Sequence, residues 1–194
     1  FHRASNSAKI VLNSFRHSRL LIRGLHAHER ELQDRYIDPY RSGDLHLYVL
    51  FPSTDSISIH ESQLVNHFHN NNNNNNNQND TEQTDDDNEQ NKNKKKKHVI
   101  LVIDGTWREA RRMNKTLPPD IVRIRLQPLS NPLFDGLRKQ LFPGSRTSTC
   151  EATVLLLREL GMHNEHCDGI LNNLKIMINH VRKMSNKQLI SFDE

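Results

Sequence analysis

The sequence predicts an α/β layered domain with a mostly parallel sheet. Strand-like segments alternate along the chain with segments of helical periodicity, which is the pattern that βαβ units produce. The chain has 194 residues, of which 34% are hydrophobic, enough for one domain of ordinary size. Ligands of such sheets bind beyond the carboxyl ends of the strands, so the residues at those ends are the first candidates for a site.

The first third of the chain predicts one helix and one strand. Apolar residues at helical spacing predict a helix from about Ser7 to Ser14, with Ser5 or Asn6 as the N-cap, whereas residues 19–25 (RLLIRGL) leave helix and strand both open. Residues 45–52 (LHLYVLFP) are rich in strand formers and end at a proline, which predicts a buried strand.

The next segment, residues 58–68 (SIHESQLVNHF), favours a helix and leads into an insert. Residues 70–97 are rich in Asn, Asp and Lys and contain no apolar side chain. They cannot bury surface to offset their ordering entropy, so we expect a disordered loop that interrupts a single domain of residues 1–194. A surface loop lengthens at small cost, so we expect the fold to tolerate it.

The last part of the chain continues the alternation. Residues 98–104 (HVILVID) are the clearest strand, and 121–128 (IVRIRLQP) predict another. Residues 148–161 predict a helix with Gly161 just past its end, and 169–185 (GILNNLKIMINHVRKMS) predict a final helix. Its predicted buried face consists of Ile170, Leu174, Met177 and Val181.

Composition limits the classes of protein. The two cysteines, Cys150 and Cys167, are too few for a disulfide framework or a zinc site and favour a reduced, intracellular compartment, cytoplasmic or nuclear. The twelve histidines show no metal-ligand spacing, and the chain has neither an apolar run of membrane-spanning length nor a signal-peptide core. The net charge of +4 is concentrated in residues 99–194, which indicates either a polyanionic partner or a well-solvated surface.

The junction IDGTWREARRMNK, residues 103–115, is the most informative stretch. Thr106 and Glu109 match the T-x-x-E capping box, so a strand, a tight turn at Gly105 and a capped helix with Trp107 in the core would explain it without any function. Asp104, however, stands at the end of the predicted strand, where a general base or a contact to a cationic ligand is often found. The adjacent backbone N–H groups could hold a carboxylate or phosphate.

The predicted helix after this junction carries a basic stripe at i, i+3, i+4 and i+7, formed by Arg108, Arg111, Arg112 and Lys115. A basic stripe that begins beside a candidate site suits a phosphate backbone brought to that site. A solvated helix face explains the same pattern, and the sequence leaves both interpretations open.

A third cluster lies in residues 144–157 (GSRTSTCEATVLLL). Ser148 and Glu151 form a second capping box, which is a structural explanation for both. Hydroxyls and free N–H groups nevertheless gather at this helix start, where Thr147 and Thr149 flank Ser148 and Arg146 precedes them. Such a loop can hold a polar ligand.

These residues carry a resemblance. IDGTWREARRM, followed about forty residues later by RTSTCEA, resembles the DTW domain family of tRNA-uridine aminocarboxypropyltransferases, and SNSAK (5–9) and LFPS (50–53) resemble two further segments of that family. The resemblance implies a SPOUT-like fold in which S-adenosylmethionine donates its 3-amino-3-carboxypropyl group to N3 of a tRNA uridine. Its sulfonium is already a good leaving group, so positioning supplies most of the catalysis and no metal is expected.

By the family's pattern, Asp104, Thr106 and Trp107 take its signature positions, and Ser148, Thr149 and Glu151 its second motif. We expect Asp104 to be the catalytic base, because the reaction needs a base for the weakly acidic uridine N–H. The residues expected at the cofactor are Pro52, Gly105, Thr106, Trp107, Ser148 and Thr149. Those expected at the RNA are Lys9, Arg108, Arg111, Arg112, Lys115 and Arg146.

The chain departs from the family in three places. NSAK replaces the family's Asn-Thr-Gly-Arg form, keeping Asn6 and a basic Lys9 but losing the glycine. A Cys-rich zinc-type segment and a strand that the resemblance implies ahead of SNSAK are both missing, so we expect the sequence to be truncated at its N-terminus. Two other functions remain open: an S-adenosylmethionine-dependent RNA methyltransferase, and a non-catalytic RNA-binding module.

Overall fold

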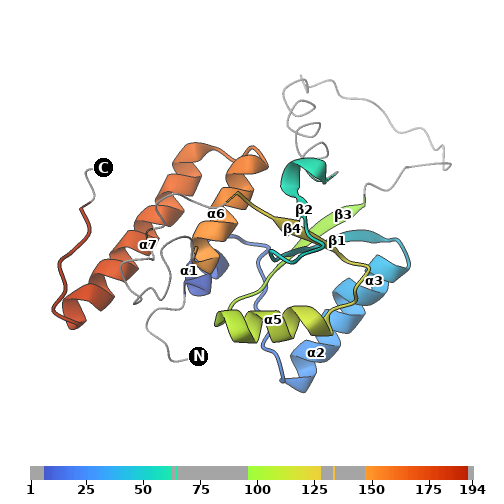
Figure 1. Cartoon of the computed structure of the whole chain (residues 1–194). Helices are drawn as coiled ribbons and strands as arrows, with labels where there is room; N and C mark the ends of the chain where they lie inside the picture. Colours follow the sequence, from blue (N-terminus) through green and yellow to red (C-terminus); the bar gives the residue numbers. More distant parts are fainter. Residues whose placement is uncertain (1–6, 63, 65–95, 128–132, 134–146, 192–194) are drawn as a thin grey trace, which may run out of the picture.

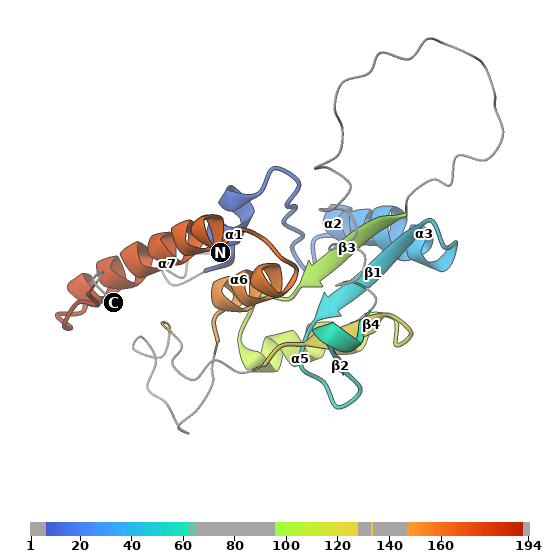
Figure 2. The same cartoon turned by 90° about the horizontal axis from the view of Figure 1, so that it is seen from above.

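A four-stranded, all-parallel sheet lies at the centre of the computed structural model (Figures 1 and 2). The structure describes residues 7–62, 64, 96–127, 133 and 147–191. The strands are β1 (Leu45–Leu50), β2 (Ile57–Ser58), β3 (Lys97–Val102) and β4 (Val122–Arg125), in the order β2-β4-β1-β3. β1 is central and pairs with both β3 and β4, which confirms the predicted parallel α/β sheet.

Helices cover both faces of the sheet, and further helices pack outside the helix layer on one of these faces (Figure 1). They are α1 (Ala8–Ser14), α2 (His26–Leu32), a π-helix (Gln33–Ile37), α3 (Asp38–Arg41), a 3-10 turn (Ile59–Glu61), α5 (Trp107–Thr116), α6 (Thr149–Glu159) and α7 (Asn164–Met184). No helix in the described ranges is long and apolar enough to cross a bilayer.

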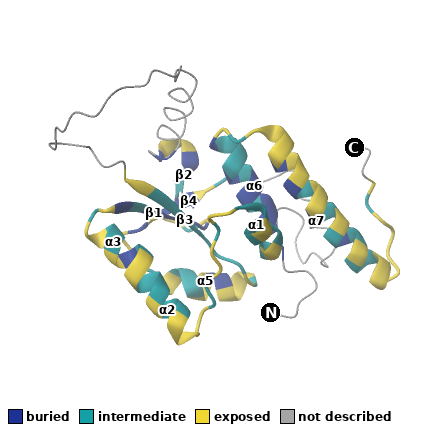
Figure 3. Ribbon diagram, turned by 180° about the vertical axis from the view of Figure 1, so that it is seen from behind, coloured by how far each residue is buried: buried dark blue, intermediate teal, exposed yellow. Residues whose placement is uncertain are grey.

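The period of two along β1 divides the core between the faces of the sheet. Leu45, Leu47 and Val49 pack with α5 and the segment of α2 to α3, whereas Tyr48 and Leu50 pack with α6. A third cluster joins α1, α6 and α7. Helix α6 therefore lies between the sheet and α7, and α7 presents its buried residues to α6 and its exposed ones to solvent (Figure 3).

Most predicted elements are confirmed. The helix expected from about Ser7 begins at Ala8, so the N-cap position falls on Ser7 and the predicted N-cap, Ser5 or Asn6, was wrong. The strands expected in 45–52, 98–104 and 121–128 are β1, β3 and β4. Gly161 follows α6 with φ +84°, the left-handed conformation expected of a glycine past a helix end. The final helix begins earlier than expected, at Asn164, and Ile178 is buried on its inner face where Val181 was expected.

Three segments differ from the predictions. Residues 57–61 form an edge strand and a 3-10 turn, so the start of the predicted helix at 58–68 was wrong, and residues 65–68 lie outside the described part. Residues 70–95 of the insert also lie outside it, whereas Lys96 is described and Lys97 pairs with Leu45 and so belongs to the sheet. Residues 19–25, for which the sequence leaves helix and strand both open, form neither.

The helical run from His26 to Arg41 was not predicted. Its apolar residues do have helical spacing, since Leu32, Tyr36 and Tyr40 contact the core at i, i+4 and i+8. Pro39 argues against one continuous helix because it lacks an N–H and clashes with the preceding turn. The chain resolves this conflict with a π-helical turn, closed by Asp38 N–H donating to Gln33 O, immediately before the proline.

A buried arginine fixes the end of α5. Arg123 of β4 is only 6% exposed, and its Nη1 lies 2.5–2.9 Å from the carbonyl oxygens of Pro118, Pro119 and Ile121. Its Nε and Nη2 reach Asn114 at 3.3–3.4 Å. A cation among carbonyls at a helix C-terminus is favourable both by hydrogen bonding and by the helix dipole.

Replacing Arg123 with Met should lower the free energy of unfolding by about 3 kcal/mol, because one buried and several half-buried carbonyls lose their donor together. For a domain of this size that corresponds to a fall of roughly 6–12 °C in melting temperature. Circular dichroism measures it. Replacement of the exposed Arg41 by Met is the control, and an equal loss there would contradict the assigned role of Arg123.

Candidate functional site

The two sequence motifs meet at the carboxyl end of the sheet. Thr149 Oγ1 donates a 2.7 Å hydrogen bond to Asp104 Oδ1, across 45 positions of sequence. Asp104 follows β3, and Thr149 is the first residue of α6. The site therefore combines a carboxylate at a strand end with a helix start, as the sequence predicted for Asp104.

The turn after Asp104 is a complete capping box. Thr106 Oγ1 accepts from Glu109 N–H at 3.3 Å, and Thr106 N–H donates to Glu109 Oε2 at 2.8 Å, which confirms the structural role predicted for this pair. A Cβ at Gly105 would lie 3.3 Å from both Glu109 Cβ and Met113 Cε. Glycine therefore leaves room for the side chains of Glu109 and Met113 beside the turn.

Trp107 is 48% exposed, so its expected place in the core was wrong. The residue opens α5 beyond the end of β3, and Ala110, one turn later, is the buried contact of this helix with the core. The indole stacks instead on Phe51, with ring centroids 5.3 Å apart and planes 19° apart. Arg111 Cζ lies 5.6 Å from the indole centroid, in cation–π range.

Pro52 follows Phe51 at the end of β1 and is exposed. Pro52 and Trp107 thus lie beyond the ends of the neighbouring strands β1 and β3, and the stacking of Phe51 on Trp107 connects these two ends. The hydroxyls of Thr106 and Ser148 cap the helices α5 and α6. Any contact of these two residues with a ligand would therefore come from the backbone around them.

The start of α6 is held from three directions. Ser148 Oγ accepts from Glu151 N–H at 3.1 Å, and Glu151 Oε2 accepts from Ser148 N–H at 2.9 Å, so this predicted capping box is also present. Glu151 is 1% exposed and also accepts from the backbone N–H of Leu133, which ties in the chain ahead of the motif. Ser7 Oγ accepts from Cys150 N–H at 3.3 Å.

The last contact matters because Ser7 belongs to the SNSAK segment. Its buried side chain caps the first turn of α6, one residue away from the Thr149 that contacts Asp104. Three segments that are far apart in sequence are therefore joined by two hydrogen bonds. We consequently place the candidate site at Asp104, Thr149 and the two helix starts around them.

The predicted basic stripe lies on the solvent side of α5. Arg108, Arg111, Arg112 and Lys115 are all exposed, and Arg111 contacts Trp107. Lys9 is exposed on the first turn of α1. Arg146 lies outside the described residues. The stripe begins next to the site, but contact with RNA stays a prediction.

The cysteines near the site are packing residues. Burial raises the pKa of the Cys150 thiol to about 12, with the charge of Glu151 adding to the effect, so the thiolate nucleophile is absent at neutral pH. Burial also raises the pKa of Cys167. Among the described residues, no group of three or more His, Cys, Asp and Glu side chains could hold a metal ion.

Sequence reasoning missed two residues of this site, Phe51 and Ser7. The sequence pattern places Phe51 within a buried strand, and its position at the end of that strand is the signal that could have found it. Ser7 was placed at the start of a helix, and nothing in its local sequence shows that its hydroxyl serves a different helix.

The comparison with known protein families gives a match over most of the chain. The sequence profile of the DTW domain matches residues 1–182, which includes every residue of the site. No curated protein and no solved structure matches the chain. The chain therefore belongs to the DTW domain family, the family of tRNA-uridine aminocarboxypropyltransferases.

Proposed function

We propose that this protein transfers the 3-amino-3-carboxypropyl group of S-adenosylmethionine to N3 of a uridine in tRNA. The observation that supports the proposal best is the hydrogen bond between Thr149 Oγ1 and Asp104 Oδ1, because it joins the two motifs of the family in one site. A tRNA substrate is consistent with an activity inside the cell.

The residues present fit this donor. Its ammonium and sulfonium groups are cationic, and the site offers the Asp104 carboxylate and the stacked rings of Phe51 and Trp107. Its carboxylate suits the N-terminal ends of α5 and α6, whose first backbone N–H groups are donors. Pro52 and Gly105 follow the strands β1 and β3 and add no polar side chain at these strand ends.

The donor supplies an electrophilic carbon: the new bond forms between that carbon and uridine N3, the carbon–sulfur bond breaks with its electron pair going to sulfur, and methylthioadenosine leaves. Asp104 accepts the proton from N3–H in this proposal. Since Thr149 occupies Oδ1, the proton would go to Oδ2, and the hydroxyl would fix the orientation of the carboxylate. Correct positioning of the two reactants accounts for much of the expected rate.

The proposal is tested by incubating the protein with two preparations of S-adenosylmethionine and bulk tRNA. One preparation carries its label in the carboxypropyl carbons and the other in the methyl group. Carboxypropyl label in a tRNA uridine, with methylthioadenosine as by-product, is the expected result. Methyl label in RNA with S-adenosylhomocysteine would show a methyltransferase instead, and tRNA binding without transfer would show a binding module.

A further inference from the structure

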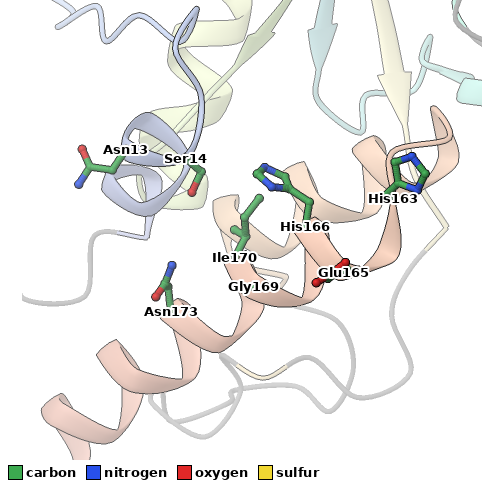
Figure 4. Close-up of a pocket in the computed structure, with 8 residues that line it drawn as sticks. All are labelled: Asn13, Ser14, His163, Glu165, His166, Gly169, Ile170 and Asn173. Atoms are coloured by element: carbon green, nitrogen blue, oxygen red, sulfur yellow. The ribbon is translucent and has the colours of Figure 1, made fainter. Parts of the chain in front are cut away.

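A cleft of about 780 Å³ lies where α1 packs beside the first half of α7 (Figure 4). It is lined by Asn13, Ser14, His163, Glu165, His166, Gly169, Ile170 and Asn173. None of these residues belongs to the candidate site at Asp104. His166, Ile170 and Asn173 share one face of α7 by their i, i+4 and i+7 spacing, and Figure 4 shows them projecting toward α1.

Gly169 has no packing reason to be glycine. It lies inside α7, where glycine is the least favourable residue after proline. A Cβ placed on it would meet nothing within 4 Å. Glycine at this position therefore leaves space open in the cleft. It does not relieve a close contact, so packing does not explain its low helix propensity here.

The chemistry of the lining favours a neutral polar heterocycle. The eight residues include one carboxylate, Glu165, and neither lysine nor arginine, which disfavours a phosphate. Asn side chains read the hydrogen-bonding edges of bases, carboxylates accept from exocyclic amino groups, and imidazoles stack on bases. The ring of His166 is already packed edge-on against Phe15, with centroids 5.6 Å apart, so its orientation is restricted before a ligand binds.

The cleft is also connected to the candidate site by a rigid element. Ser7 contacts the start of α6, and α1 continues from there to Asn13 and Ser14 at the cleft, a rise of about 10 Å along the helix. The exposed Lys9 lies between these two ends of α1. In an RNA strand whose uridine lay at Asp104, the phosphate backbone would contact Lys9, and a nearby base would reach the cleft between α1 and α7.

We propose that this cleft binds the base of an unpaired nucleotide close to the modified uridine, and that it prefers a base with an exocyclic amino group over uracil. This inference rests on the proposed tRNA substrate. Phosphates of the same strand would pass outside the cleft, along the basic side chains.

The first experiment fills the cleft. Gly169→Leu should raise the melting temperature, since leucine is a far better helix former, and should raise KM for bulk tRNA about tenfold with little change in kcat or in KM for S-adenosylmethionine. Asn173→Ala, which removes an amide without adding bulk, should raise the same KM severalfold. The matched control is Asn172→Leu, at an exposed position of α7 that does not line the cleft.

Unchanged KM for tRNA in both Gly169→Leu and Asn173→Ala would overturn the inference while leaving the proposed activity intact. A second measurement separates the two proposals if wild-type protein transfers nothing: titration with CMP or UMP followed by NMR. CMP should shift the side-chain amide signals of Asn13 and Asn173 more than UMP does, and Gly169→Leu should abolish the shifts. Equal or absent shifts up to the solubility limit would show that the cleft is no base site.

Discussion

The Asp104→Asn variant is expected to lose about 10²–10⁴-fold of the transfer rate, which is the usual contribution of a positioned acid–base group. Asparagine is close to aspartate in size and can still accept from Thr149, so the fold should be preserved. Activity should be partly recovered at higher pH, because more of the uridine ionises without a base. Rate measurements with saturating S-adenosylmethionine across a pH series show both effects.

Thr149→Val is the matched variant, since it removes the hydroxyl that orients Asp104 but keeps the carboxylate. We expect it to lose about tenfold and to show no recovery at high pH. Near-full turnover by Asp104→Asn would exclude Asp104 as the base. Loss of S-adenosylmethionine affinity in the same variant would instead indicate contact with the cationic groups of the donor, in which case another group takes the proton.

Reversing the charges of Arg108, Arg111 and Arg112 together should weaken tRNA binding on the order of 10²-fold, because each side chain neutralises phosphate charge in the proposed complex. The slope of the logarithm of the binding constant against that of the salt concentration should become shallower by about 2–3. Fluorescence anisotropy with labelled tRNA at several salt concentrations measures both quantities.

The control for this variant has the same net charge but keeps the stripe. Arg41, Lys183 and Lys187 are exposed on other parts of the chain, and their reversal should leave the slope unchanged apart from a general electrostatic effect. S-adenosylmethionine binding should be unaffected in the control variant. Equal losses of tRNA affinity in both would show that net charge alone, and no stripe on α5, attracts the RNA.

Elements with strong local signals were predictable from the sequence. Both capping boxes, at Thr106 and at Ser148, fix a helix start within four residues of chain, and the structure contains each of them. The same holds for β3, a continuous apolar run before a polar junction. The sequence shows directly that Asp104 follows β3. In a parallel sheet the carboxyl ends of neighbouring strands lie at one edge, which is where ligands bind.

The features that sequence reasoning missed depend on distant parts of the chain. The π-helical turn before Pro39 is a compromise between a helical apolar stripe and a residue that breaks helices, and local propensity does not decide between them. Trp107 stacks on Phe51 of another strand end and stays half exposed, and no local pattern around Trp107 encodes that distant contact. The Ser7 contact with α6 likewise exists only in the folded protein.

The stack of Phe51, Trp107 and Arg111 also provides a built-in optical probe. Trp107 is the single tryptophan of the chain, so all indole emission comes from the edge of the candidate site. A ligand that displaces Arg111 or excludes water there should change that emission, which allows titrations with unlabelled protein. In denaturant, the indole emission would report the opening of the start of α5, whereas circular dichroism would report the loss of helices and sheet together. Disagreement between the indole transition and the circular dichroism transition would therefore measure how independently this corner of the molecule unfolds.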